Sequence, residues 1–340
     1  MFEVINGGFK TSVQDCGRVG WMNIGIPPSG AFDCYSLRMG NLLVGNSTGS
    51  VPAVGGEPGE AGLEAILFGL KLKTLRETVI AVTGADVSPT LDDKPLEMWK
   101  AVRVCPGDII TFGTPKFGCR AYLTIAGGIR VPTFLGSKST YLEMGGDVGG
   151  LHGRPLKKGD IVATAEPKSP LSELEGREAK SSAIPRYLRE PHTSWNVNVI
   201  MGPQDYLFTD EAVEIFQKTQ WEVNSNSDRA GYRYIGPTLN YKPKASDLVK
   251  DTTEEPSNTA CDGNVPGSIQ VPGAIEPIVI GVDGPSFGCF AKIATVILTD
   301  LAKVAQSKPK EKTWFNPTSI EEASRRIEQE ERLLTEDSIR

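Results

Sequence analysis

Residues 79–126 read VIAVTGADVSPTLDDKPLEMWKAVRVCPGDIITFGTPKFGCRAYLTIA and contain four short runs of mostly β-branched and apolar residues. The runs cover residues 79–83, 101–105, 108–112 and 120–126, and Gly, Pro and Asp lie between them. Short runs bounded by turn-forming residues are typical of the strands of sandwiches and barrels. This stretch therefore predicts a mainly β fold.

The same pattern continues on the C-terminal side, at residues 195–200, 277–281 and 293–297. Residues 267–273 alternate as an edge strand would, with Ser268 and Gln270 on one face. Helices are few, and we expect three of them: from the N-cap Asp33 to Val44, from about Thr209 to Thr219, and from a capping box that starts at Ser319. The charged end of the last helix is expected to fray.

Two polar segments divide the chain. Residues 166–194 are rich in Lys, Glu, Ser and Pro, which predicts a linker or a long surface loop. We therefore expect one β subdomain over residues 1–165, a second over 195–316, and a charged helix or tail over 317–340. A further polar insertion at about 241–262 is expected to be exposed and mobile.

Composition and charge argue against several classes of protein. The 340 residues carry a formal net charge of −6 without a strong basic run, so nucleic-acid binding is not expected. No stretch approaches the roughly 18 apolar residues of a membrane span, and the N-terminus lacks a signal-peptide pattern, which predicts a cytoplasmic protein without a membrane partner. The six cysteines form no C-x-x-C pair, which favours reduced structural thiols, and no residues are proposed as metal ligands.

A loop punctuated by glycines, residues 11–33, contains five polar candidates for a site. They are Gln14, Asp15, Arg18, Ser29 and Asp33. Binding and catalytic groups concentrate on loops that a rigid scaffold holds in place. The loop is therefore either a functional loop or a cluster of structural turns.

More candidates follow in the middle of the chain. Lys138 lies between hydroxyls and after a glycine, where the backbone N–H groups and the ammonium could bind an anion, or the segment could simply join two strands. Gln204 lies between a strand and a helix and either binds a ligand or caps that helix. Asp228 and Arg229 are either a weak surface pair or, in a cleft, a site for a carboxylate or a phosphate.

The last candidates surround residues 267–292. Ser268 and Gln270 share a face of the expected edge strand, and Asp283 and Ser286 belong to a Gly-rich loop before the apolar run that starts after Lys292. A lysine at the entrance to a buried strand either snorkels to solvent or acts as a functional cation, and we favour the second role.

Together these motifs resemble one family over nearly the whole chain, from about residue 2 to residue 324. The chain resembles the biotin-dependent carboxyltransferase-domain family, which includes the C subunit of 5-oxoprolinase (also called allophanate hydrolase subunit 2, or KipA-like) and the matching region of urea carboxylase and urea amidolyase. The motifs that carry the resemblance are Thr11-Ser-Val-Gln-Asp15, Gly17-Arg18, Gly25-Ile-Pro27, Ser29-Gly-Ala31, Asp33, Asn41-Leu-Leu-Val-Gly-Asn46, Thr83-Gly-Ala-Asp86, Ala126-Gly-Gly128, Leu135-Gly-Ser137, Ser139-Thr140, Gly202-Pro-Gln-Asp205, Ser227-Asp-Arg229, Gly231-Tyr-Arg233 and Gly267-Ser-Ile-Gln-Val-Pro272.

The resemblance implies a mainly β fold with two cyclophilin-like β-barrel subdomains and a few short helices. It also implies an enzyme subunit that acts on an amide-like N–C=O group. One possibility is a hydrolase that opens 5-oxoproline to glutamate with ATP and partner subunits; the alternative is transfer of a carboxyl group from carboxybiotin to urea or a related amide. Because the chain has no Met-Lys-Met biotin signature and no phosphate-binding loop, no cofactor is expected to be bound covalently, and ATP or carboxybiotin would come through a partner subunit.

The roles of the candidate residues follow from that chemistry, which needs stabilisation of an oxyanion and a group that moves a proton. The catalytic candidates are Asp15, Arg18, Asp228, Arg229 and Lys292. The candidates for binding a small amide, lactam or urea-type substrate are Gln14, Ser29, Asp33, Lys138, Gln204, Ser268, Gln270, Asp283 and Ser286.

One departure keeps other functions open. In Asp283-Gly-Pro-Ser-Phe-Gly-Cys-Phe290, which resembles the urea carboxylase version of this loop, Cys289 replaces a glycine, while residues 291–296 look like the 5-oxoprolinase version. A non-catalytic regulatory binding protein and a repurposed standalone enzyme on the same fold are the two further hypotheses.

Overall fold

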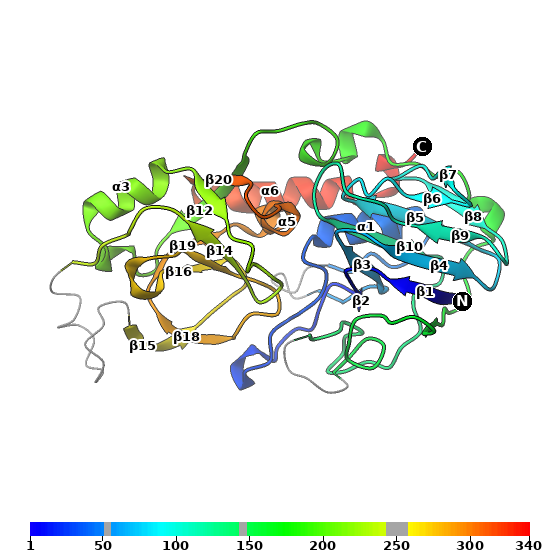
Figure 1. The fold of residues 1–340 in the computed structure, drawn as a ribbon, viewed down its shortest axis with the longest axis horizontal. Helices are drawn as coiled ribbons and strands as arrows, with labels where there is room; N and C mark the ends of the chain where they lie inside the picture. The colour runs from blue at the N-terminus through cyan, green and yellow to red at the C-terminus, as the bar shows by residue number, and fades with distance from the viewer. Residues whose placement is uncertain (51–55, 143–147, 243–257) are drawn as a thin grey trace. The chain divides into compact units, whose positions relative to one another are not determined.

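The computed structural model describes residues 1–50, 56–142, 148–242 and 258–340. The chain divides into two compact units, unit 1 with Met1–Gly20, Pro28–Pro191 and Gln329–Arg340, and unit 2 with Trp21–Pro27 and His192–Glu328. Both units consist mainly of β-strands with a few helices, which confirms the predicted fold class (Figure 1).

Unit 1 contains two antiparallel sheets that share one hydrophobic core. In β4, for example, the buried Leu70 and Leu72 alternate with the more exposed Lys71 and Lys73. The six-stranded sheet has the order β11 (Ile161–Val162), β1 (Phe2–Gly7), β4 (Leu70–Thr74), β9 (Ile109–Thr111), β6 (Thr90–Leu91) and β7 (Lys94–Pro95). The five-stranded sheet has the order β2 (Lys10–Gln14), β3 (Gly62–Ile66), β10 (Arg120–Ile125), β5 (Thr78–Gly84) and β8 (Ala101–Val104).

Helix α1 (Cys34–Leu43) packs on strands β5 and β10 of the five-stranded sheet. The Thr83 hydroxyl donates to Ser36 O at 2.7 Å, and a Cβ added at Gly40 would lie only 2.8 Å from the Thr124 side chain. Every residue of β10 is buried as a result, and the expected helix from Asp33 to Val44 is confirmed.

Residues 166–194, expected as a linker or surface loop, contain short helices and contribute to the core of unit 1. They form α2 (Leu171–Leu174) and the 3₁₀ turns η3 (Ser181–Ala183) and η4 (Arg186–Leu188). Leu174, Ala183 and Leu188 pack in one cluster with side chains of α1.

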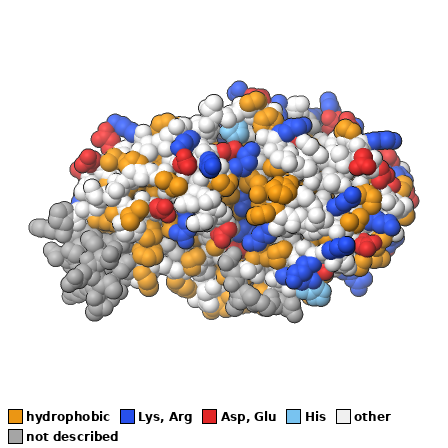
Figure 2. Space-filling view, in the orientation of Figure 1, with side chains coloured by type: hydrophobic (Ala, Val, Ile, Leu, Met, Phe, Trp, Pro, Cys, Tyr) orange, Lys and Arg blue, Asp and Glu red, His pale blue; other side chains and the backbone are white. Residues whose placement is uncertain are grey.

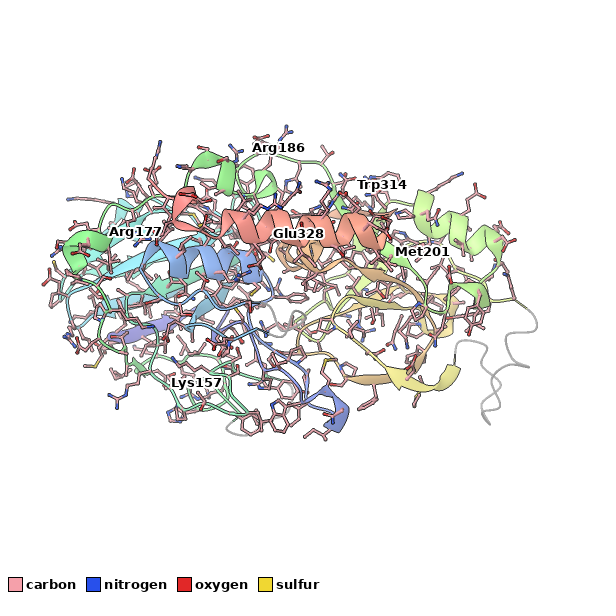
Figure 3. The ribbon with its side chains drawn as sticks, turned by 180° about the vertical axis from the view of Figure 1, so that it is seen from behind. Lys157, Arg177, Arg186, Met201, Trp314 and Glu328 are labelled. Carbon is pink, nitrogen blue, oxygen red and sulfur yellow. A yellow bond between two sulfur atoms is a disulfide. The ribbon has the colours of Figure 1, made fainter. Side chains whose placement is uncertain are left out.

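The expectation of a frayed C-terminus is wrong. Helix α6 (Ile320–Leu333) begins at the predicted cap, where Glu322 N donates to Ser319 Oγ at 3.2 Å, and η8 (Glu336–Ser338) follows it. Arg177, labelled in Figure 3, donates to Glu336 Oε1 at 2.6 Å, and Ile339 forms a β-bridge with Ala179. These contacts tie the last residues to unit 1.

The core of unit 2 is a closed seven-stranded barrel. The first strand closes it by pairing in parallel with the last, so that Trp195 faces Thr313. The order is β12 (Trp195–Met201), β19 (Lys292–Val296), β16 (Ser268–Gln270), β17 (Ile278–Ile280), β14 (Gly231–Ile235), β13 (Trp221–Val223) and β20 (Lys312–Pro317). The prediction of an edge strand at residues 267–273 is wrong, because β16 lies between two other strands of the barrel.

Helices and one small sheet complete unit 2. The expected helix α3 (Asp210–Lys218) is capped by the Thr209 side chain, and α5 (Leu301–Gln306) is the other α-helix between residues 192 and 317 among those described. Short 3₁₀ turns are η1 (Met22–Ile24), η5 (Asp205–Leu207), η6 (Pro272–Ala274) and η7 (Leu298–Asp300). Strands β15 (Asn258–Gly263) and β18 (Phe287–Phe290) pair with each other (Figure 1). Most of the polar insertion expected at 241–262 lies outside the described residues.

Two surface observations bear on the expected partners. No helix within the described ranges is long and apolar enough to cross a lipid bilayer. On the face drawn in Figure 2, Lys and Arg side chains are interspersed with acidic and apolar ones. That this protein has no nucleic-acid partner stays a prediction.

Candidate functional site

The Asp15 carboxylate is the centre of a buried hydrogen-bond network in unit 1. It accepts hydrogen bonds from four groups: Gly17 N at 2.8 Å, Lys138 N at 2.6 Å, the Ser137 hydroxyl at 2.6 Å and the Ser139 hydroxyl. Burial raises the pKa of the Asp15 carboxyl, although the four hydrogen bonds favour its charged form. The network joins the end of β2 to the loop at residues 137–139.

Two segments of the 11–33 loop cross closely beside this network. Arg18 N donates to Pro28 O at 2.8 Å. A Cβ at Gly17 would lie 2.7 Å from Pro28 O, and one at Gly30 would lie 2.7 Å from Gly17 N. Both glycines also have positive φ, +94° and +87°, so this crossing requires glycine at both positions.

The other candidates in this loop differ in what they contact. The buried Arg18 donates from Nη2 to Ser139 O, and its guanidinium carbon lies 5.7 Å from the centre of the Phe134 ring. Gln14 uses its amide nitrogen inside the unit, whereas Gln14 Oε1 and Ser29 Oγ are buried without a hydrogen-bond partner among the described residues. These two oxygens are the groups of the loop that a ligand could satisfy.

Asp33 and Lys138 have partners of their own. Asp33 caps α1: its carboxylate accepts from Ser36 N at 3.0 Å and from the Ser36 hydroxyl at 2.7 Å. Lys138 Nζ forms an ion pair with Glu60 at 2.7 Å. The structure thus supports a helix-capping role for Asp33 and leaves Lys138 less available to an anion.

A buried pair that sequence reasoning missed positions the end of the same loop. The Tyr122 hydroxyl donates to Glu64 Oε2 at 2.7 Å and accepts from Asp33 N at 2.8 Å. Glu64 also accepts from Phe32 N at 2.9 Å. Burial, followed by the nearby Glu64 charge, raises the pKa of Tyr122, which keeps its hydroxyl protonated as a donor.

In unit 2, the candidates Arg229 and Asp283 form a fully buried ion pair. Arg229 Nε lies 2.7 Å from Asp283 Oδ2, and Nη2 lies 3.0 Å from Oδ1. Asp228, in contrast, is exposed and accepts from the backbone N–H groups of Ala230 and Gly231. The geometry supports structural roles for all three: a buried pair and a turn.

A second group of residues, which we call the Lys292 cluster, consists of the buried polar residues Asn264, Gln270, Ser286 and Lys292 and the half-buried Gly288. Gln270 and Lys292 are partners across β16 and β19, so their side chains share a face of the barrel wall. Gln270 Nε2 donates to Asn264 Oδ1 at 3.1 Å, and Asn264 N donates to Ser286 O at 2.8 Å. A Cβ at Gly288 would lie 2.4 Å from both Asn264 Nδ2 and Gln270 Nε2, so the ends of these two side chains pack directly on Gly288.

The Lys292 cluster contains polar atoms that the described residues leave without a hydrogen bond. Asn264 Nδ2 and Ser286 Oγ are buried without a hydrogen-bond partner among the described residues. Lys292 is 2% exposed, and its Nζ lies 3.3 Å from Asp262 Oδ2, which is an ion-pair distance without hydrogen-bond geometry. Buried polar groups are nearly always hydrogen-bonded, so these atoms indicate a binding site for an oxygen-rich group.

Gln204 and Ser268 form hydrogen bonds that fix the backbone around this cluster. Gln204 Oε1 accepts from Lys292 N at 2.8 Å, and Gln204 N donates to Lys292 O at 3.0 Å. Ser268 Oγ accepts from Val265 N at 3.2 Å and closes the turn before β16. Sequence reasoning missed Asn264 and Asp262, although the turn-forming Asp262-Gly-Asn264 just before Gly267 was a usable signal.

The expectation of six reduced thiols is wrong for one pair. Cys261 and Cys289 form a disulfide, 28 residues apart in the sequence, while Cys16, Cys34, Cys105 and Cys119 are not in disulfides. The two cysteines belong to the paired strands β15 and β18, a pairing that spacing along the chain does not reveal.

Comparison with known families now places the chain. Residues 24–317 match the family model described as carboxyltransferase domain, subdomain A and B. The chain belongs to this family. The match includes the Lys292 cluster and the second part of the 11–33 loop, and it confirms the predicted resemblance.

Relatives of this carboxyltransferase-domain chain fall into two groups. It is 40% identical over 331 residues to urea amidolyase of Lachancea kluyveri, covering 95% of this chain but 17% of that protein. It is 32% identical over 334 residues to the 5-oxoprolinase C subunit of Escherichia coli (strain K12), covering 98% and 96%. Its fold matches the crystal structure of K. lactis urea amidolyase with a TM-score of 0.87 at 36% identity, over 100% of this chain and 20% of that one.

The carboxyltransferase-domain chain also has a pocket of about 500 Å³ in unit 1, between β5, the β6–β7 hairpin and η4. Asp86, Trp99, Lys116 and Arg189 are among the residues that line it. None of the predicted site residues lines this pocket. The volume of a pocket is therefore not enough to identify the candidate site in this chain.

Proposed function

We propose that this chain provides the site for an amide-like N–C=O group in an ATP-dependent, multi-subunit enzyme, most like the C subunit of 5-oxoprolinase in the opening of 5-oxoproline to glutamate. The observation that carries the proposal is the Lys292 cluster. The Lys292 ammonium and the Asn264 amide N–H group, which has no acceptor among the described residues, suit a carbonyl oxygen that becomes negative during attack on a lactam. Buried donors stabilise such an oxyanion strongly. ATP would act through partner subunits.

A second candidate is transfer of a carboxyl group from carboxybiotin to urea or a related amide. The 40% identity to a urea amidolyase and the TM-score of 0.87 favour it. The same donors fit, because urea, biotin and a lactam all present an N–C=O oxygen. Carboxybiotin would be a substrate delivered by a partner subunit, and a cytoplasmic location is part of either proposal.

The test is ATP turnover by the chain together with its partner subunits, measured with 5-oxoproline or with urea. Lys292→Gln should lower the turnover rate by about 10²-fold, the usual loss when one donor to an oxyanion is removed. Lys218→Gln is the matched control, because Lys218 is exposed on α3 and pairs only with Glu214 among the described residues. The absence of turnover with both substrates, or equal rates for the two variants, would contradict the proposal.

A further inference from the structure

The Cys261–Cys289 disulfide links the only two strands that pair outside the larger sheets of the described residues. Asp262 faces Gly288 and Gly263 faces Phe287, and the disulfide joins the neighbours of the first pair, Cys261 and Cys289, where the register of the two strands shifts. Both flanking residues belong to the candidate site: Gly288 packs against Asn264 and Gln270, and Asp262 pairs with Lys292. The disulfide therefore lies one residue from each of these contacts.

Among the described residues, β18 is the strand partner of β15, and two-stranded sheets are marginally stable in water. Both strands continue into the barrel: β15 leads through residues 264–267 into β16, and β18 leads through Ala291 into β19. The covalent bond adds a cross-link beside Asp262 that holds β15 against β18.

The Asp262 carboxylate forms an ion pair with the Lys292 ammonium, which is the group that an oxygen ligand would need. Its side chain is 55% exposed and reaches the buried Lys292 ammonium at 3.3 Å. A carboxylate at this distance competes with any carbonyl or carboxylate oxygen for the same cation. Loss of the fixed position of β15 would remove that competitor.

We propose that the Cys261–Cys289 disulfide is a redox latch that holds Asp262 on Lys292, so that reduction frees Lys292 for a carbonyl or carboxylate oxygen. The reductant is a dithiol: it gives two electrons and two protons to the disulfide, leaves two cysteine thiols and becomes a disulfide itself. Cys261 is exposed, as an accessible regulatory disulfide must be. The identity of the ligand rests on the proposed function, but the latch does not.

The test compares the full chain after air oxidation and after treatment with dithiothreitol. Alkylation and mass spectrometry should find four free thiols in the first state and six in the second. Hydrogen exchange at residues 261–263 and 287–289 should become about tenfold faster on reduction, because local opening becomes easier. On reduction, the rate of Lys292 acetylation by a water-soluble ester should rise to a similar extent, while the rate for the exposed Lys218 stays constant.

Variants separate the bond from the ion pair. The double variant Cys261→Ser with Cys289→Ser should show the fast hydrogen exchange and fast Lys292 acetylation of the reduced chain, both after oxidation and after dithiothreitol treatment. Its far-UV circular dichroism should be unchanged. Asp262→Asn should make Lys292 acetylation fast even in the oxidised chain, while the response of hydrogen exchange to reduction persists. Six free thiols after oxidation, or Lys292 acetylation that ignores both reduction and Asp262→Asn, would overturn the latch.

Titration calorimetry with 5-oxoproline and with urea in both states distinguishes the two proposals. Binding that is at least several-fold tighter after reduction supports both. If acetylation responds to reduction but neither compound binds, the latch stands and the proposed function fails. Equal binding in the two states, together with unresponsive acetylation, leaves the proposed function standing and rejects the latch.

Discussion

The Asp15 carboxylate shows how a residue can fit a catalytic motif and still be committed to structure. Asp15→Asn replaces one acceptor oxygen with an NH₂ group that faces donors, so we expect a loss of about 1–3 kcal/mol in the free energy of unfolding at neutral pH. Urea denaturation of the two proteins measures the difference.

The pH dependence of that difference in stability tests why the pKa of Asp15 is raised. Because burial raises the pKa of Asp15 in the folded chain, its protonated form contributes stability that is fully present below the unfolded value of 3.8 and is lost as the pH rises through the folded value. The advantage of the wild type over Asp15→Asn should therefore grow on acidification from neutral pH. An advantage that shrinks instead would mean that the four hydrogen bonds dominate over burial.

At the residue scale, the sequence predicted which side chains are unusual but not what they contact. Asp15 meets Ser137 and Ser139, more than 120 residues away, and Asp283 meets Arg229, 54 residues away. An aspartate that binds a substrate and one that binds its own fold look alike in a sequence. Asn264 was missed for the converse reason: the turn-forming residues 262–264 mark a loop, but they do not show that the Asn264 amide nitrogen lacks a partner among the described residues.

At the element scale, local signals predicted α1, α3 and α6 but not the short α2 and α5, and the cap of α1 can be tested. Asp33→Ala removes the acceptor for Ser36 N and should cost about 0.5–2 kcal/mol of stability. Asp33→Ser should restore most of that loss, because serine is also a good N-cap. The measurement is thermal or urea unfolding of the three proteins.

The same pair of variants separates capping from proton transfer. If Asp33 acts only as a cap, Asp33→Ser keeps both stability and the turnover of the assembled enzyme. A stable Asp33→Ser protein without turnover would assign Asp33 to the chemistry instead. The matched helix, α3, offers a control in Thr209→Ala, which removes a cap from unit 2.

Elements whose environment depends on distant partners were predicted less well. β16 alternates like an edge strand, but β17 follows it in sequence on one side and β19 pairs on the other, so its polar face turns to the Lys292 cluster. The C-terminal segment carries many charges, which suggested fraying. In the structure Arg38 and Arg177 bind its Glu331 and Glu336, and these partners cannot be read from the helix itself.

At the scale of the whole molecule, the fold class was predictable and the division of the chain was less so. Strand runs and turn residues are local features, so a mainly β fold follows from them. The polar stretch at 166–194 looked like a boundary because composition does not show that Leu174, Ala183 and Leu188 pack with α1. Barrel closure between β12 and β20 pairs residues more than 100 positions apart, and only the structure reveals it.

That closure leads to the last prediction, which concerns autonomous folding of unit 2. All seven barrel strands lie between Trp195 and Pro317, and the buried Arg229–Asp283 pair belongs to the same unit. A fragment of residues 192–328 should therefore fold alone, with a cooperative urea transition and a near-UV spectrum from packed aromatic residues such as Phe216 and Phe315.

In both the fragment and the full chain, Asp283→Asn should lower the free energy of unfolding by about 3–5 kcal/mol, because it leaves a buried guanidinium without its counter-charge. Asp228→Asn, at an exposed turn, should cost much less in both. A fragment that lacks a cooperative transition, or an Asp283→Asn variant as stable as Asp228→Asn, would show that the barrel does not depend on its own closure and buried pair.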